Sequence, residues 1–281
     1  FPGDLERLMP FLDRCMELLP LFSEVGIKTV VNGPITHTPD DNVLAGPQAG
    51  HPNFWNLCGS SIGIAQGGLG RYMAQWMVHG QTELNMASLD SRRFGAWADR
   101  DYCITKAIES YEIMYTAVGV NDNRPHARLK RISPLHALLA EKGAVHTAVQ
   151  GYEKPLWFKT DLIQSEPPTW QRSAAHAAVA EECAAVHHTA GIIDISGAAK
   201  FEISGPDAST FLDKMSSNKL PAKNGRMALT LFHAANGGIM TEQSITRINE
   251  QLYYLIGPIA SEYRDLDWMQ QHRSGFNVKI D

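Results

Sequence analysis

The chain has 281 residues, of which 44% are hydrophobic and 20% charged, as in an ordinary soluble globular protein. No uncharged apolar stretch approaches the ~18 residues of a membrane-spanning helix, and a net charge of −5 argues against a nucleic-acid surface. The cysteines Cys15, Cys58, Cys103 and Cys183 include no CxxC pair, which argues against a zinc site and a disulfide framework. Because the sequence begins Phe-Pro-Gly without Met, we expect it to be a piece of a longer protein.

The N-terminal part of the chain predicts two helices and two strands. Leucine and methionine recur at helical spacing over residues 4–19, whose first residue is a suitable N-cap, and Pro10 is expected to kink or split this helix. The β-branched residues 27–31 predict a strand. Residues 53–58 predict a buried strand, which a glycine-rich turn connects to an amphipathic helix over residues 71–78.

The rest of the chain changes from helices and turns to a mixed pattern. Residues 101–116 and 134–141 predict helices, and residues 160–172, which contain two successive prolines, predict a linker. From residue 173 on, helices alternate with short strands, which is typical of an α+β unit. The elements expected there are helices over 174–189 and 207–215 and strands over 192–195, 200–203, 227–232, 243–248 and 252–256.

The glycine-rich stretch from Cys58 to Gly70 is a candidate ligand-binding motif. Glycines allow a backbone to approach a ligand closely, and the N-terminus of a helix favours negative charge. The stretch lacks the third glycine of a dinucleotide-binding fingerprint and the acidic residue expected about 20 residues further on, so we exclude that fingerprint. Taken alone, the stretch is better explained by tight packing of a helix on a strand.

Several motifs in a fixed order are more specific than any one of them. The loop Asn32–Asp40 (NGPITHTPD) is followed by AGP at 45–47, CGSSIGIAQGGLGR at 58–71 and LDSRRF at 89–94. Together they resemble the sarcosine and dimethylglycine dehydrogenase family, in which an amine-oxidase-type FAD domain is joined to a folate-binding domain shared with the T-protein of the glycine cleavage system. The resemblance continues through ESY at 109–111, RLKRISPL at 128–135, GYEKPLWF at 151–158, GIIDIS at 191–196 and GGIMTEQSITR at 237–247.

The resemblance implies a flavin site made from the loop and the glycine-rich turn. The residues that would line the cofactor are Thr38, Pro39, Ser61, Ile62, Gly63 and Ile64. The helix that follows would direct its positive end toward the anionic end of a reduced flavin, worth roughly 0.3–1 kcal/mol or more when buried. His37 would face the substrate as a catalytic residue, because histidine exchanges protons near neutral pH. A surface position for His37 is the alternative.

The family reaction is oxidative N-demethylation. The resemblance therefore implies a small N-methylated amine such as sarcosine or dimethylglycine as the substrate, and FAD as the acceptor of the hydride equivalent. Tetrahydrofolate would capture the one-carbon unit, and electrons would leave through an electron-transfer flavoprotein or oxygen. The compartment implied is the cytoplasm of a bacterium or the mitochondrial matrix of a eukaryote.

In the folate half, Glu242 stands where the family places a carboxylate and is the candidate catalytic residue. An exposed strand glutamate is the alternative. Asp194 and Asn218 match the family pattern as candidate folate-binding residues, with a cap and a turn residue as alternatives. Where the family has a tyrosine and an asparagine, this chain has Leu229 and Ala234. The folate half is therefore open to three roles: binding tetrahydrofolate, binding another one-carbon acceptor, or serving as structure.

We predict an α+β (mixed α/β) chain in three parts. Residues 1–91 would be the C-terminal part of an FAD domain, 92–158 a central linking segment, and 159–281 the N-terminal part of a T-protein-like domain. Arg92 and Arg93 are expected to form an ion-paired joint between domains. The isolated chain is predicted not to retain flavin. The alternatives are a non-catalytic homologue that acts as a regulatory or scaffolding subunit, and a free-standing aminomethyltransferase, against which the N-terminal part argues.

Overall fold

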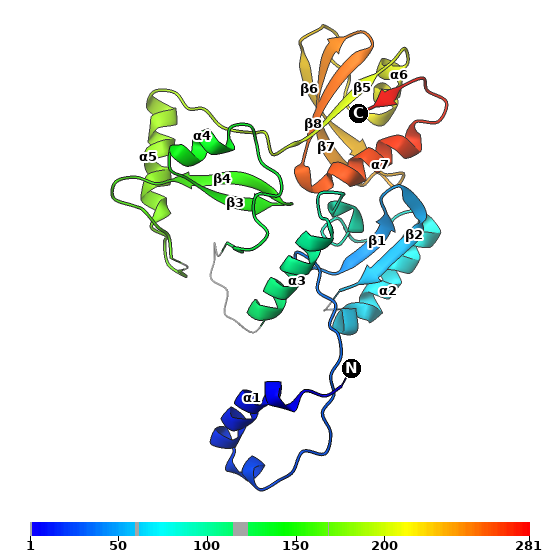
Figure 1. The fold of residues 1–281 in the computed structure, drawn as a ribbon. Coiled ribbons are helices and arrows are strands. Elements are labelled where there is room, and N and C mark those ends of the chain that lie inside the picture. Colours follow the sequence, from blue (N-terminus) through cyan, green and yellow to red (C-terminus); the bar gives the residue numbers. More distant parts are fainter. Residues whose placement is uncertain (1, 60–61, 115–122, 168) are drawn as a thin grey trace. The chain divides into compact units, whose positions relative to one another are not determined.

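The computed structural model describes residues 2–59, 62–114, 123–167 and 169–281, drawn in Figure 1. They divide into two compact units, Phe1–Thr36 and His37–Asp281, which are described separately. Helices and antiparallel sheets follow one another along the chain, which confirms the predicted α+β class. Within the described residues, no helix is long and apolar enough to cross a bilayer.

The N-terminal unit is built around the helix α1 (Leu5–Leu18). The side chain of Asp4 accepts a hydrogen bond from the backbone N–H three residues on, at 3.0 Å, so the predicted N-cap is confirmed. The helix continues through Pro10 and does not split there. A 3₁₀ helix, η1 (Pro20–Ser23), follows. The strand predicted at 27–31 is wrong, because these residues pair with no other strand and a β-branched run needs such a partner.

A hairpin and a helix begin the second unit. β1 (Leu44–Gln48) pairs antiparallel with β2 (His51–Cys58), and α2 (Ile62–His79) packs against β1. The predicted helix at 71–78 therefore exists but begins earlier, with the glycine-rich stretch forming its first turns. Phe54 and Leu57 are exposed, so the prediction that β2 is buried is wrong. In a two-stranded sheet only one face of the strand packs on a core. That core consists of Val43, Ala45, Leu69, Met73 and Met86.

A second hairpin follows, which the sequence did not predict. Its strands β3 (Ala144–Val149) and β4 (Tyr152–Phe158) are antiparallel, and α5 (Ala175–His188) packs on β4 around the buried Trp157. The elements that lead to it are η2 (Ser91–Arg93), α3 (Arg100–Ile113) and α4 (His136–Glu141). The helices predicted at 101–116, 134–141 and 174–189 are thus confirmed to within a few residues, except that positions after Met114 in the first lie outside the described residues.

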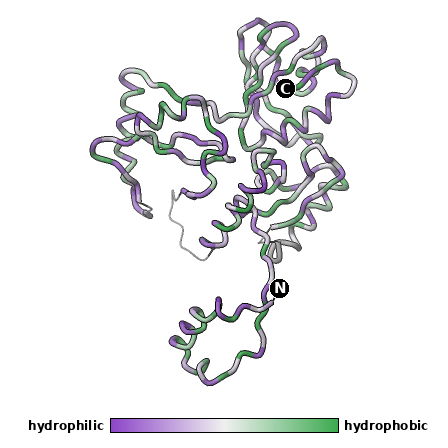
Figure 2. Tube along the Cα trace, viewed as in Figure 1, coloured by the Kyte–Doolittle hydropathy of each residue, from purple (hydrophilic) through white to green (hydrophobic). Residues whose placement is uncertain are grey.

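An antiparallel sheet of strand order β6-β7-β8-β5-β9 forms the last part, and one of its faces is covered by helices (Figure 1). Figure 2 shows polar and apolar residues mixed along these strands, as expected when only one face is buried. The core includes Phe201, Phe211 and Phe232. The elements are β5 (Ala199–Ser204), α6 (Ala208–Met215), β6 (Met227–His233), β7 (Ile239–Asn249), β8 (Leu252–Gly257), η3 (Ile259–Ser261), α7 (Glu262–His272) and β9 (Lys279–Ile280).

Most of the sequence predictions for this sheet are confirmed. The strands at 200–203, 227–232, 243–248 and 252–256 and the helix at 207–215 all exist. The strand predicted at 192–195 is wrong, because these residues are unpaired and mostly exposed. The helix α7 was not predicted.

Candidate functional site

The loop that the sequence assigned to the flavin is a tight turn closed by its own hydrogen bonds. Thr38 and Pro39 are buried. The Thr38 hydroxyl donates to the Asn42 carbonyl at 2.7 Å, and the Asp41 N–H donates to the Thr38 carbonyl at 3.3 Å. Asp41 has φ +63°, in the left-handed region that few residues other than glycine, asparagine and aspartate adopt readily. We call residues 38–42 the TPD loop.

Two arginines hold the TPD loop from outside. Arg93 forms a fork with the Asp40 carboxylate, with N···O distances of 2.7 and 2.8 Å, and donates to the Asn42 carbonyl at 3.0 Å. Arg124 donates to the Pro39 carbonyl at 2.8 Å. A planar guanidinium with several fixed donors can bind a carboxylate and a carbonyl together, which a lysine cannot do in the same geometry.

His37 lies at the start of the second unit and is packed against the TPD loop. Its side chain is 5% exposed, so it is buried and not on the surface. Its Nδ1 lies 3.5 Å from Oδ1 of Asp41, and its ring meets the Tyr111 ring edge-on with centroids 5.9 Å apart. Its Nε2 is buried and has no hydrogen-bond partner among the described residues. A buried ring nitrogen without a partner is a place where a ligand or water is expected.

The two motifs assigned to the flavin lie close together. Gly59, at the end of β2, has φ +129°, and a Cβ placed there would lie 3.1 Å from Cα of Val43 and 3.6 Å from Cγ2 of Thr38. The φ value and the short distance to Val43, the residue after the TPD loop, both favour glycine at this position, and Thr38 of the loop lies in ordinary contact with it. Ser61 lies outside the described residues. Ile62, Gly63 and Ile64 form the first turn of α2, whose backbone N–H groups have no partner within the helix. This positive helix end fits an anionic ligand.

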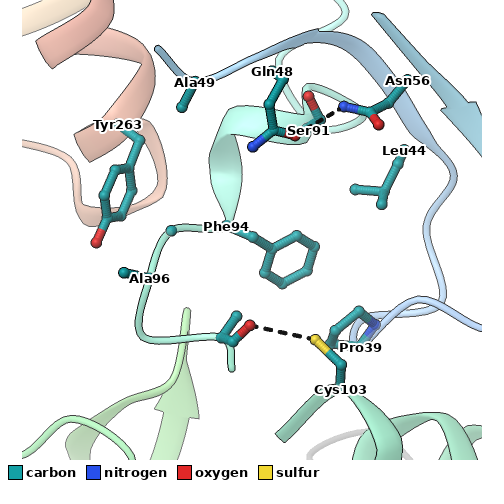
Figure 3. Close-up of a pocket in the computed structure, with 12 residues that line it drawn as sticks. Pro39, Leu44, Gln48, Ala49, Asn56, Ser91, Phe94, Ala96, Cys103 and Tyr263 are labelled. Atoms are coloured by element: carbon teal, nitrogen blue, oxygen red, sulfur yellow. Dashed lines mark hydrogen bonds between the residues drawn. The ribbon is translucent and has the colours of Figure 1, made fainter. Parts of the chain in front are cut away.

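A cavity of about 400 Å³ lies next to the TPD loop (Figure 3). Pro39 lines it from the loop, and Tyr263 lines it from α7. The ring of Phe94 points into its centre in Figure 3. On the hairpin side, the Asn56 amide donates to Oε1 of Gln48 at 3.1 Å. The cavity has the size of a small-molecule pocket.

The predicted ion-paired joint is confirmed at Arg92. Its guanidinium bonds to Asp90, with the shortest N···O distance 2.7 Å, and to Asp267 of α7 at 3.2 Å. Burial alone would lower the pKa of Arg92, but the two carboxylates outweigh it and raise the pKa above its ordinary value. The guanidinium therefore stays charged and joins η2 to α7.

The candidate residues of the folate half lie on or beside the face of the last sheet that points away from its core. Leu229 and Leu231 of β6 point outward, and Glu242 of β7 is exposed opposite Leu231 in the register. Asn218 lies next to this pair of strands, where its amide donates to the Leu229 carbonyl at 2.7 Å. Leu229, at the position where the family has a tyrosine, thus lies on the same face as Glu242.

Asp194 lies at the second hairpin and is held by hydroxyl and amide donors. It accepts hydrogen bonds from the Ser133 hydroxyl at 2.7 Å and from the Ser196 N–H at 2.8 Å. Burial would raise its pKa, but these hydrogen bonds outweigh burial and lower the pKa. A capping role accounts for both of these contacts.

Sequence analysis missed a buried cluster of charges behind the TPD loop. Glu109 of α3 is 2% exposed and binds Lys106, Arg124 and His126. In the sequence, Glu109 stands out only as part of the ESY motif. The spacing of Lys106 and Glu109, three residues apart on a helix, was the signal available for this pair.

Comparison with protein families gives two matches that follow one another along the chain. Residues 79–133 match the FAD dependent oxidoreductase central domain, and residues 135–281 match the GCVT N-terminal domain. The second match covers more than half of the chain. The fold and these matches define a protein that joins an oxidoreductase central domain to a GCVT domain, and the chain belongs to the GCVT N-terminal domain family. The boundaries predicted at residues 91/92 and 158/159 stay a prediction.

Relatives confirm the predicted resemblance to dimethylglycine and sarcosine dehydrogenases. Mitochondrial dimethylglycine dehydrogenase of Rattus norvegicus is 31% identical over 100% of this chain and 33% of its own length. Mitochondrial sarcosine dehydrogenase of Mus musculus is 27% identical over 88% of the chain and 30% of its length. The mitochondrial pyruvate dehydrogenase phosphatase regulatory subunit of Mus musculus is 27% identical over 96% of the chain and 32% of its length. The chain thus spans about a third of these relatives.

A solved structure also resembles the chain. It is the glycine cleavage system aminomethyltransferase T from Bartonella henselae, with a TM-score of 0.43 and 22% identity, covering 53% of this chain and 37% of that chain.

Proposed function

We propose that this chain is part of an FAD-dependent oxidoreductase that acts on the CH–NH group of a small N-methylated amino acid such as dimethylglycine or sarcosine. The observation that carries the proposal is the meeting of the TPD loop, the buried His37 and the strand end that precedes α2. The relatives named dimethylglycine and sarcosine dehydrogenase support the substrate class. Bound FAD would supply the acceptor for the hydride equivalent that leaves the N-methyl group.

The residues of this chain would prepare the substrate and stabilise charge. With Nδ1 facing Asp41, a neutral His37 ring presents Nε2 as an acceptor for the proton of the substrate ammonium group. An amine that has lost this proton has the free electron pair that oxidation to an iminium requires. The first turn of α2, with Ile62, Gly63 and Ile64, would direct its N–H groups at the negative charge of the reduced cofactor.

The test is an absorbance spectrum of the full-length protein, followed by anaerobic addition of dimethylglycine, sarcosine and related N-methyl amines. We expect a flavin band that bleaches with at least one of them. A flavin that stays oxidised with every amine contradicts the substrate class. A protein without a flavin band contradicts the oxidoreductase function.

For the folate half, we propose that the outer face of β6 and β7 holds tetrahydrofolate, with Glu242 near the amine that captures the one-carbon unit. The match to the GCVT N-terminal domain supports this role. Glu242→Gln should shift the product from methylene-tetrahydrofolate toward formaldehyde and leave flavin reduction unchanged. Glu202→Gln is a matched control, since Glu202 is also exposed on this sheet. An unchanged product ratio in Glu242→Gln contradicts the role of Glu242.

A non-catalytic regulatory subunit is the second candidate function. It is favoured by the regulatory-subunit relative and by Leu229 at the position of the family tyrosine. It predicts that the full-length protein binds no flavin or is not reduced by amines, so the same spectrum separates the two functions.

We further propose an electron-transfer flavoprotein as the electron acceptor, and a bacterial cytoplasm or a mitochondrial matrix as the compartment. The mitochondrial relatives support the second location. Reduction of an electron-transfer flavoprotein by the substrate-reduced protein, compared with reduction of oxygen, tests the acceptor.

A further inference from the structure

The carboxylate of Glu109 is the centre of a buried charge cluster that the proposed function does not use. Its Oε2 accepts from Nζ of Lys106 at 2.7 Å and from Nε of Arg124 at 2.9 Å. Its Oε1 accepts from the His126 N–H at 2.8 Å. Burial alone would raise the pKa of Glu109, but the hydrogen bonds from Lys106 and His126 outweigh burial and lower the pKa. Glu109 is therefore charged and fixed.

The other donors of Arg124 connect this cluster to the TPD loop. One terminal nitrogen donates to the Ser110 hydroxyl at 2.6 Å and to the Lys106 carbonyl at 3.1 Å. The other donates to the Pro39 carbonyl at 2.8 Å and lies 3.6 Å from Oδ2 of Asp41. Because the guanidinium is planar, the bonds to Glu109 and Ser110 fix the direction in which the last nitrogen meets the loop.

The backbone of the loop explains why it benefits from such support. Asp41 has φ +63°, a left-handed conformation that aspartate adopts more readily than most residues but that still costs more than a right-handed one, so outside contacts such as those of Arg124 stabilise it. Asp41 is also the carboxylate that faces Nδ1 of His37. Two residues of α3 therefore act on the surroundings of His37. Tyr111 contacts the His37 ring directly. Glu109 binds Arg124, which lies beside the Asp41 carboxylate.

We propose that Glu109 is a positioning residue, which acts through Arg124 to hold the TPD loop and thereby set the His37 ring in the proposed flavin and amine site. The proposal rests on the proposed function. It gives the central segment a role in the oxidation step beyond joining two domains. Among the described residues, Glu109 has no hydrogen bond to the TPD loop, so its effect must pass through Arg124.

A second buried pair in the same segment is a matched control. Arg128 binds Glu153 through two nitrogens, and Oε1 of Glu153 accepts from the Leu129 N–H at 2.8 Å. The exposed fractions are also matched, with 25% for the Arg128 side chain and 26% for that of Arg124. The contacts of Arg128 are to Glu153 and to the His146 carbonyl, and they do not involve the TPD loop.

The experiment compares Arg124→Lys and Glu109→Gln with Arg128→Lys and Glu153→Gln in the full-length protein. Hydrogen exchange of the backbone amides of residues 38 and 40–42 reports on the loop, and the rate constant of flavin reduction by the amine reports on the site. In the first pair we expect exchange to speed up and flavin reduction to slow by about tenfold or more, the effect of losing a charge-assisted hydrogen bond. In the control pair both quantities should stay within about twofold of the wild type, although thermal stability falls in all four variants.

Three outcomes would overturn the proposal. Loop exchange that is unchanged in Arg124→Lys and Glu109→Gln would show that the cluster does not hold the loop. Equal effects in both pairs would show that general destabilisation is the cause. Faster exchange with unchanged flavin reduction would show that the loop does not position the reacting groups. If instead no amine reduces the wild type, the proposed function fails, and the exchange data still decide whether Glu109 holds the loop.

Discussion

Arg92 and Asp267 lie 175 positions apart in the sequence, and their side chains form an ion pair of 3.2 Å. Asp267 also accepts a hydrogen bond from the Gly50 N–H at the β1–β2 turn, at 3.3 Å. A single carboxylate on α7 therefore holds both the first hairpin and η2. The contact joins η2 to α7, which lies within the match to the GCVT N-terminal domain.

Asp267→Asn should weaken this joint. Asn keeps the shape of the side chain but replaces a charge-assisted hydrogen bond with a neutral one, so we expect the free energy of unfolding to fall by about 1–1.5 kcal/mol. Urea denaturation measures the change. Glu17→Gln is the control, because the Arg14–Glu17 pair is exposed and should contribute at most about 0.5 kcal/mol. Equal effects of the two substitutions would contradict a structural role for the joint.

Gly205→Ala tests a close backbone approach beside β5. Gly205 has φ +128°, and a Cβ there would lie 2.4 Å from the carbonyl oxygen of Asn277, which leads into β9. We expect Gly205→Ala to lower the free energy of unfolding by at least about 3 kcal/mol, because backbone strain adds to a clash with an atom that cannot move away. Gly225 has φ +74°, but a Cβ there would meet open space. Gly225→Ala should therefore lower the free energy of unfolding by only about 1–2 kcal/mol. Thermal unfolding of both variants makes the comparison, and similar losses would contradict it.

The sequence predicted those elements that carry their own local signals. The helix α1 has a cap and a periodic apolar face, and β5 to β8 have alternating patterns, so each was found. The runs at 27–31 and 192–195 have the same β-branched composition but no partner strand. Pairing is a property of the whole fold, and composition alone does not report it. The start of α2 was placed too late because glycine is a poor helix former, which the surrounding packing overrides.

The site was predicted as segments and not as contacts. The loop and the turn were identified by resemblance, and Gly59 shows that they meet. The support for the loop was missed because Arg124 and Pro39 are 85 positions apart. No spacing rule in a single sequence relates two such residues. Because charged residues are mostly exposed, the sequence alone gives no reason to place Glu109 inside the fold.

Asp265 should give the protein an unusual pH dependence. Burial raises the pKa of this carboxyl above its ordinary value of 3.8, so the folded state binds the proton more tightly than the unfolded state. Between the pKa of the unfolded state and the raised pKa of the folded state, folding takes up a proton. In this range the contribution of Asp265 to the free energy of unfolding falls as the pH rises. The wild type should therefore lose stability relative to Asp265→Asn as the pH rises above the ordinary pKa of 3.8.

Glu153→Gln is the control of opposite sign. Burial alone would raise the pKa of Glu153, but the hydrogen bonds from Arg128 and the Leu129 N–H outweigh burial, so the pKa is lowered. The contribution of Glu153 to stability is thus present above its unfolded pKa and is lost as the pH falls. Urea denaturation across the pH range measures both differences. Curves of the same sign for the two variants would contradict the assignment for Asp265.

Gln243 and Asp265 should be energetically coupled. Gln243 is fully buried, and its Nε2 donates to Oδ2 of Asp265 at 2.8 Å. The same oxygen accepts from the Thr241 and Ser261 hydroxyls, each at 2.7 Å. The polar side chain at 243, inside this core, thus has a physical reason. It is one of the donors that a carboxylate inside this core requires.

Gln243→Leu should lower the free energy of unfolding by about 1–3 kcal/mol in the wild type, because the Asp265 carboxylate loses a buried donor. In the Asp265→Asn background the same substitution should cost much less, since an uncharged amide needs that donor less. A double-mutant cycle measures the difference, expected to be at least about 0.5 kcal/mol for side chains in direct contact. Additive effects would mean that Gln243 acts through packing alone. In that case its polarity would have no relation to the charge on α7.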